Sequence, residues 1–166
     1  MPILETRIER WANEAACAAT AEAMARRGAL ANAFIELHGP LGAGKTTFVR
    51  HLLQALGVEG RVKSPTYAVL EPYEVLRQGV TAAIWHFDFY RFDDPQEWED
   101  AGFREVFASV GLKLAEWPEK AEGMLPAPDV RIRIDPLDDA GASIENVVRV
   151  VRIEAYTARG SACLAR

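Results

Sequence analysis

The octapeptide at residues 39–46, Gly-Pro-Leu-Gly-Ala-Gly-Lys-Thr, has the spacing of a phosphate-binding P-loop and constrains the fold more than any other segment. Its glycines let the backbone turn without Cβ clashes, so that successive N–H groups can surround phosphate oxygens. Lys45 would reach the β- and γ-phosphates, and the Thr46 hydroxyl would bind Mg²⁺. The loop also opens a helix, whose N-terminal end favours anions. We therefore expect a nucleotide-phosphate site here.

The flanking residues supply the strand and the helix that a P-loop requires. Residues 33–38 form a short, mostly apolar run that is typical of a strand. After the loop, residues 46–56 place apolar side chains on one helical face, and Gly57 provides a C-terminal stop. These side chains belong to Phe48, Val49, Leu52, Leu53 and Leu56.

The other segments extend this unit into a sheet covered by helices. The clean alternation over 130–134 and the β-branched run over 147–153 favour an antiparallel pair. The remaining expected elements are a helix from Asn13 to about Arg27 stopped by Gly28, a loop from Ser64 that becomes a strand over 67–70, strands over 82–87 and 112–115, and a short helix starting at Asp94–Pro95. We predict a three-layer P-loop NTPase domain of the α/β class, with a mixed sheet of a parallel core and antiparallel edge strands. The helix over 13–27 would cover one face.

Composition is consistent with one cytoplasmic domain spanning residues 1–166. No apolar stretch has the length of a membrane span, and the N-terminus lacks the apolar core of a signal peptide. Cys17 and Cys163 form no spaced framework, which indicates a reducing compartment. The net charge of −5 argues against unaided binding to nucleic acid, but not against a protein partner that handles it.

Two carboxylates follow apolar strands, where open α/β sheets place their ligands. Asp88 ends the run over 84–87, and Glu116 ends the run over 112–115. Both have the position of a Walker B carboxylate, which would serve Mg²⁺ or the attacking water. Capping or ion pairing is the alternative for each. A further acidic cluster over 93–100 is instead typical of the solvated face of a helix.

Two more side chains are candidates for the γ-phosphate. Thr66, in the Ser-Pro-Thr-Tyr segment after the P-loop helix, could act as switch threonines do, although turn chemistry also explains it. Arg91 could stabilise charge or form a surface ion pair. The chain has no Asn-Lys-x-Asp segment for guanine, which leaves ATP as the expected nucleotide. Its histidines do not cluster with cysteines, so a zinc site has little support.

Five segments in this order resemble the TsaE (YjeE) family, the bacterial ATPases of tRNA threonylcarbamoyladenosine synthesis. They are 39–46, Lys-Ser-Pro-Thr-Tyr at 63–67, Glu-Pro-Tyr at 71–73, His-Phe-Asp-Phe-Tyr-Arg at 86–91 and Glu-Trp-Pro at 116–118. The likeness extends over roughly residues 10–155. It departs mildly from the family at Pro40, where an acid is common, and at Ala68, where threonine is common.

The resemblance implies a role for each site residue. Thr46 and Glu116 would ligate Mg²⁺, Asp88 would lie by the γ-phosphate and support hydrolysis, and Thr66 would belong to a switch-like loop. Lys45 would hold the phosphates and, with Asp88 and Glu116, complete the catalytic set. The segment near Glu14 would approach the adenine. The phosphate-binding loop positions are Gly39, Leu41, Gly42, Ala43, Gly44, Lys45, Thr46 and Thr47.

The resemblance also implies partners. A TsaE protein acts with TsaB and TsaD, contacts tRNA only indirectly through that complex, and does not bind a membrane. Its ATP hydrolysis would reset the TsaB–TsaD assembly rather than provide the transferred group.

Two other functions remain open on the residues. A small-molecule P-loop kinase would need a lid that carries arginine and an acceptor-binding helical insert, and only residues 93–108, with Arg104, are long enough. A nucleotide-dependent binding module without useful hydrolysis is the third hypothesis.

Overall fold

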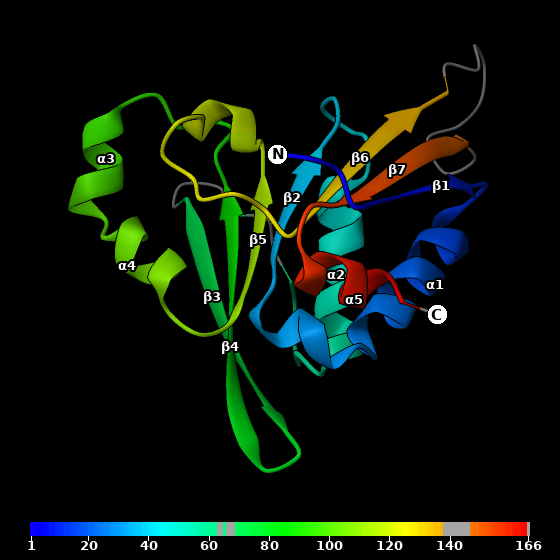
Figure 1. Ribbon diagram of the computed structural model, residues 1–166, viewed down its shortest axis with the longest axis horizontal. Helices are drawn as coiled ribbons and strands as arrows, with labels where there is room; N and C mark the ends of the chain where they lie inside the picture. The colour runs from blue at the N-terminus through cyan, green and yellow to red at the C-terminus, as the bar shows by residue number, and fades with distance from the viewer. Residues whose placement is uncertain (63–64, 66–68, 138–146, 166) are drawn as a thin grey trace.

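The computed structural model describes residues 1–62, 65, 69–137 and 147–165. Within these ranges, one sheet contains seven strands in the order β1-β7-β6-β2-β5-β4-β3 (Figure 1). β2 is parallel to β5 and β6, and β4 is parallel to β5, whereas β3, β7 and β1 pair antiparallel with their neighbours. The predicted mixed sheet, with a parallel core and antiparallel edge strands, is therefore confirmed. The strands are β1 (Glu5–Trp11), β2 (Phe34–His38), β3 (Leu70–Arg77), β4 (Val80–Asp88), β5 (Leu112–Glu116), β6 (Val130–Pro136) and β7 (Arg149–Ala155).

Helices pack on both faces of this sheet. α1, α2 and α5 contribute to one hydrophobic core, whereas α3 and α4 build a second core on the other side of the parallel strands (Figure 1). β2 supplies both, because Ile35 and Leu37 join the first core and Phe34 joins the second. The helices are α1 (Glu14–Ala25), α2 (Lys45–Leu56), α3 (Pro95–Asp100), α4 (Phe103–Ala108) and α5 (Ala158–Leu164), with 3₁₀ turns η1 (Gly28–Asn32) and η2 (Pro118–Ala121).

The second core is largely aromatic. Phe87 on β4 lies 4.8 Å from Phe107 and 5.4 Å from Phe103, measured between ring centroids. Trp98 is the buried residue of α3, while the acidic residues around it are exposed. The acidic cluster therefore forms a solvated helix face, as expected, and the helix is anchored by its tryptophan.

Local signals predicted several boundaries well. Asn13 caps α1 by accepting from the Ala16 N–H, Asp94 caps α3, and Gly57 ends α2 in the left-handed region. The five predicted apolar residues of α2 are all buried. β6 and β7 form the expected antiparallel pair.

Other boundaries differ from the prediction. α1 ends at Ala25 with Arg26 as its C-cap, and Gly28 opens a 3₁₀ turn instead of stopping the helix. The strand expected over 67–70 is described only from Leu70 onward, where β3 continues to Arg77 and forms a hairpin with β4. Residues 66–68 lie outside the described part of the chain. β1 and α5 were not predicted.

Among the described residues, no helix has both the length and the apolar character needed to cross a membrane.

Candidate functional site

The P-loop joins the end of β2 to the start of α2, in the strand–loop–helix context that the motif predicted. Gly39 has a φ of 148°, and a Cβ added there would lie 2.4 Å from the Ile134 carbonyl oxygen of β6. Gly44, with a φ of 107°, forms the N-cap of α2. A side chain at either position would strain the backbone, so both glycines are required by the path of the loop.

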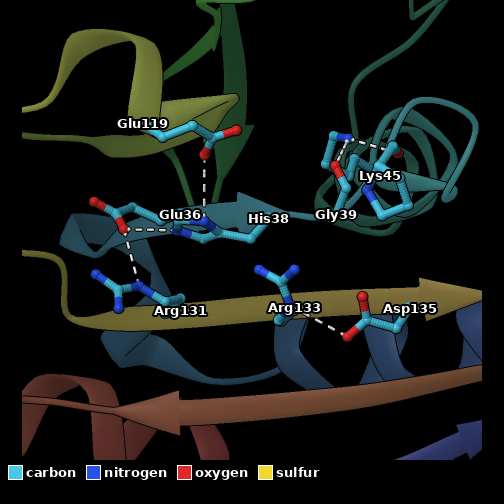
Figure 2. A network of polar contacts seen from close by, with 9 residues as sticks. Glu36, His38, Gly39, Lys45, Glu119, Arg131, Arg133 and Asp135 are labelled. Carbon is cyan, nitrogen blue, oxygen red and sulfur yellow. Dashed lines mark hydrogen bonds and ion pairs between the residues drawn. The ribbon is translucent and has the colours of Figure 1, made fainter.

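Lys45 is buried to 4% exposure and folds back over its own loop. Its Nζ donates to the carbonyl oxygens of Gly39, at 2.5 Å, and Pro40, at 3.0 Å (Figure 2 shows the lysine beside Gly39). The same ammonium lies 4.1 Å from the centroid of the Trp117 ring. Burial lowers the pKa of Lys45, and the negative charges of Glu116, Glu119 and Asp88 partly oppose that shift. The site thus holds a desolvated cation that an anionic ligand would stabilise.

Glu116, at the end of β5, is held from two sides. Its Oε1 accepts from the Thr46 hydroxyl at 2.8 Å, and its Oε2 lies 2.6 Å from Nε2 of His86. Thr46 lies in the first turn of α2, and His86 lies on β4. The structure therefore brings together the two residues predicted to ligate Mg²⁺.

Asp88 lies directly beside Glu116 across the sheet. The parallel register of β4 and β5 pairs the two residues, because both strands end at the same edge. The Asp88 carboxylate accepts from the Tyr90 N–H at 3.0 Å, and the side chain is half-buried. The strand-end position predicted for this pair of acids is confirmed, while their chemical roles stay predictions.

A cavity of about 310 Å³ lies over the P-loop and is lined by most of the residues predicted to form the nucleotide site. Its lining consists of Leu41, Gly42, Ala43, Gly44, Lys45, Thr46, Thr47, Asp88, Tyr90, Glu116, Trp117 and Arg149. Gly39 does not line it, but its carbonyl receives the Lys45 ammonium. Thr66 lies outside the described residues. The motif, the two strand-end acids and the cavity thus coincide.

Two weaker candidates lie away from this cavity. Arg91 is exposed and is not among the lining residues. Glu14 accepts from His51 at 2.9 Å and from Arg50 at 3.3 Å, and the hydrogen bond from His51 is the main reason that the pKa of Glu14 is lowered. Its described contacts join α1 to α2 rather than to the P-loop.

Sequence reasoning missed Arg149. It opens β7, its Nε donates to the Ala43 carbonyl at 2.6 Å, and a Cβ on Gly44 would lie 3.2 Å from the same atom. No local motif marks this arginine, and only the antiparallel return of β7 beside β6 brings it to the loop. It adds a positive charge to the lining of the cavity.

A second polar network borders the start of the loop on the other face of the sheet (Figure 2). His38, the last residue of β2, lies 3.0 Å from Glu36 and 3.4 Å from Glu119. Arg131 on β6 lies 3.2 Å from the same Glu36. These contacts tie β2 to β6 and η2 at the point where the chain enters Gly39, so they fix the base of the P-loop.

The donors around Glu116 suit a hard cation. Mg²⁺ prefers oxygen ligands and usually takes one or two from the protein, with phosphates and water completing its shell. Thr46 and Glu116 provide such oxygens at the P-loop. Within the described ranges, no group of three or more His, Cys, Asp or Glu side chains could hold a metal by itself. The residues therefore fit a magnesium ion that arrives with a nucleotide.

Comparison with known proteins identifies relatives of this chain. A family model described as "Threonylcarbamoyl adenosine biosynthesis protein TsaE" matches residues 11–144. The "tRNA threonylcarbamoyladenosine biosynthesis protein TsaE" of Haemophilus influenzae is 46% identical over 106 residues, which cover 64% of this chain and 65% of the relative. The protein of the same name from Bacillus subtilis is 38% identical over 105 residues, which cover 63% of each. The alignments thus span less than two thirds of these relatives.

The fold also has a solved counterpart. The crystal structure of Bacillus subtilis YdiB superposes with a TM-score of 0.74 at 26% sequence identity, and the match covers 99% of this chain and 95% of that one.

Proposed function

The chain belongs to the TsaE family, and we propose that it is the ATP-binding and ATP-hydrolysing component of the bacterial machinery that makes threonylcarbamoyladenosine in tRNA. What supports the proposal most directly is that Lys45, Thr46, Asp88 and Glu116 line one cavity over a P-loop. P-loop NTPases use a phosphate-binding loop with its lysine, a carboxylate for Mg²⁺ and a group that positions the attacking water, and residues of these kinds meet in this cavity.

Each residue would have a distinct task. Amides of residues 41–47 would surround the phosphates, and Lys45 would leave its two loop carbonyls to bind the β- and γ-phosphates. Thr46 and Glu116 would hold Mg²⁺, which when bound neutralises phosphate charge. Asp88 would orient the water that attacks the γ-phosphate. Arg149 would hold the loop in place through the Ala43 carbonyl.

The partners in this proposal are TsaB and TsaD, whose complex the protein would reset by hydrolysing ATP in the cytoplasm. It would meet tRNA only through that complex. The family's place in tRNA threonylcarbamoyladenosine biosynthesis and the net charge of −5 both support contact with proteins rather than direct binding to RNA.

Adding a TsaB–TsaD complex is expected to raise the rate of ATP hydrolysis at least about tenfold over the isolated protein, because partners commonly complete the catalytic geometry of P-loop enzymes. Phosphate release measured with and without the complex checks this. The control is the complex alone. An unchanged rate would contradict the proposal, and transfer of phosphate to small hydroxylated acceptors without any partner would favour a metabolite kinase instead.

Trp117 is expected to report ATP–Mg²⁺ binding by its fluorescence, because its ring contacts Lys45 and lies next to Glu116. Trp117→Phe should remove most of the intensity change. Trp85→Phe is the matched control, since that ring contacts a different lysine, Lys113, at 5.3 Å. A Trp117→Phe protein that keeps the full response would show that another tryptophan is the reporter.

A further inference from the structure

We propose that His86 is a positioning residue, which holds the carboxylate of Glu116 in the orientation needed to ligate Mg²⁺. The inference rests on the proposed function, because it concerns the magnesium site of that function. Neither the P-loop motif nor the rule that acids follow the strands accounts for a histidine at position 86. The proposal gives this histidine a role.

The contact between the two side chains is short and dry. Nε2 of His86 lies 2.6 Å from Oε2 of Glu116, and the side chains are 0% and 3% exposed. A carboxylate oxygen can only accept, so the imidazole donates its Nε2–H. A hydrogen bond to a charged acceptor that is shielded from water is strong and directional. The histidine therefore restricts the orientation of the carboxylate.

The second ring nitrogen of His86 makes no comparable contact in the described part of the chain. This atom, Nδ1, is the one buried side-chain nitrogen or oxygen without a hydrogen-bond partner among the described residues. Leaving a buried polar atom without a partner destabilises the fold, and an apolar side chain of similar size would avoid that loss. The use of a histidine at this position is consequently explained by its Nε2 contact with Glu116.

The geometry of β4 and β5 places His86 next to Glu116. Side chains two residues apart on a strand point to the same face of the sheet. His86 and Asp88 therefore both point to the α2 side of β4. Glu116 lies opposite Asp88 in the register, which places its carboxylate within reach of the histidine on the neighbouring strand. β4 thus contributes the acid Asp88 to the cavity and the donor His86 to the carboxylate of Glu116.

Thr46 completes the arrangement from the other side. Its hydroxyl contacts Oε1 at 2.8 Å, while His86 contacts Oε2. A hydroxyl has one proton and two lone pairs, so Thr46 can donate to Glu116 and turn a lone pair toward a metal ion at the same time. The carboxylate is then oriented by two donors, Thr46 and His86. Loss of such supporting hydrogen bonds commonly weakens metal affinity about 10- to 100-fold.

The test compares His86→Leu, which removes the donor, with His86→Gln, whose side-chain nitrogen can take the place of Nε2. Binding of a non-hydrolysable ATP analogue is measured by calorimetry in excess Mg²⁺ and in EDTA. We expect His86→Leu to weaken binding about tenfold or more in Mg²⁺ and less than about twofold in EDTA, with most of the loss restored in His86→Gln. Ile84→Val, a buried change on the same strand, controls for disturbance of the core.

Loss of affinity by the same factor in Mg²⁺ and in EDTA would overturn the inference, since it would mark His86 as a residue of the core only. Unchanged affinity in Mg²⁺ would overturn it as well. If His86→Leu does not fold by circular dichroism, His86→Asn replaces it, because that shorter amide does not reach Glu116. A wild-type protein that binds the analogue without any dependence on Mg²⁺ would instead overturn the proposed magnesium site, and this inference with it.

Discussion

Replacing Lys45 with alanine is expected to reduce the affinity for ATP about 100- to 1000-fold, which would remove measurable binding in a calorimeter. The lysine is buried, and its ammonium now contacts only loop carbonyls and the Trp117 ring among the described residues. Two charge-assisted hydrogen bonds to phosphates, each worth about 1.5–3 kcal/mol, account for a loss of this size. Burial lowers the pKa of Lys45, and phosphate oxygens would oppose that shift by stabilising the charged form.

Lys113→Ala is the matched control for this experiment. Lys113 is another buried lysine whose pKa is lowered mainly by burial, and it lies on β5, three residues before Glu116. Its Nζ donates to the Ser109 carbonyl, away from the P-loop. Both variants lose a buried cation, but only Lys45→Ala should lose ATP binding. Retained affinity in Lys45→Ala, or equal losses in both variants, would contradict the phosphate assignment.

The acids of the site could be predicted because their placement follows from local patterns. Apolar residues before Asp88 and Glu116 indicate strands, and parallel strands bring their carboxyl ends to one edge. The P-loop motif predicts where α2 begins, so its position relative to that edge follows as well. Short-range rules were sufficient for this half of the site.

The other half depends on contacts between distant segments. Arg149 reaches Ala43 across 106 residues of chain, and no spacing rule connects them. His86 meets Glu116 only through the exact pairing of β4 with β5, which a sequence pattern does not specify to one residue.

The missed elements have weak signals for physical reasons. β1 is an edge strand with charged side chains on both faces, and its Ile8 is 62% exposed, so the usual alternation of apolar and polar residues is blurred. α5 has seven residues, too few to show a helical period. The β3–β4 hairpin turns at Gln78 and Gly79, both with positive φ, but glutamine is not a residue that marks such a turn.

Asp88→Ala is expected to lower partner-stimulated ATP hydrolysis about 100-fold or more while leaving ATP binding within a few-fold of wild type. A residue that orients the attacking water contributes typically about 10²- to 10⁴-fold to the rate and little to ground-state affinity. Phosphate release with TsaB and TsaD present, and calorimetry with a non-hydrolysable analogue, measure the two quantities separately. The combination distinguishes a hydrolytic role from a binding role, which the shared cavity alone does not.

Asp94→Ala controls for the local hydrogen bond that Asp88 makes. Asp88 accepts from the N–H two residues onward, at Tyr90, and Asp94 does the same with Gln96 at 2.9 Å. Both alanine variants lose this turn-stabilising contact, but Asp94 does not line the cavity. If only Asp88→Ala loses hydrolysis, the effect belongs to the carboxylate beside Glu116. Unchanged hydrolysis in Asp88→Ala would refute its catalytic assignment and show that the protein hydrolyses ATP through other groups.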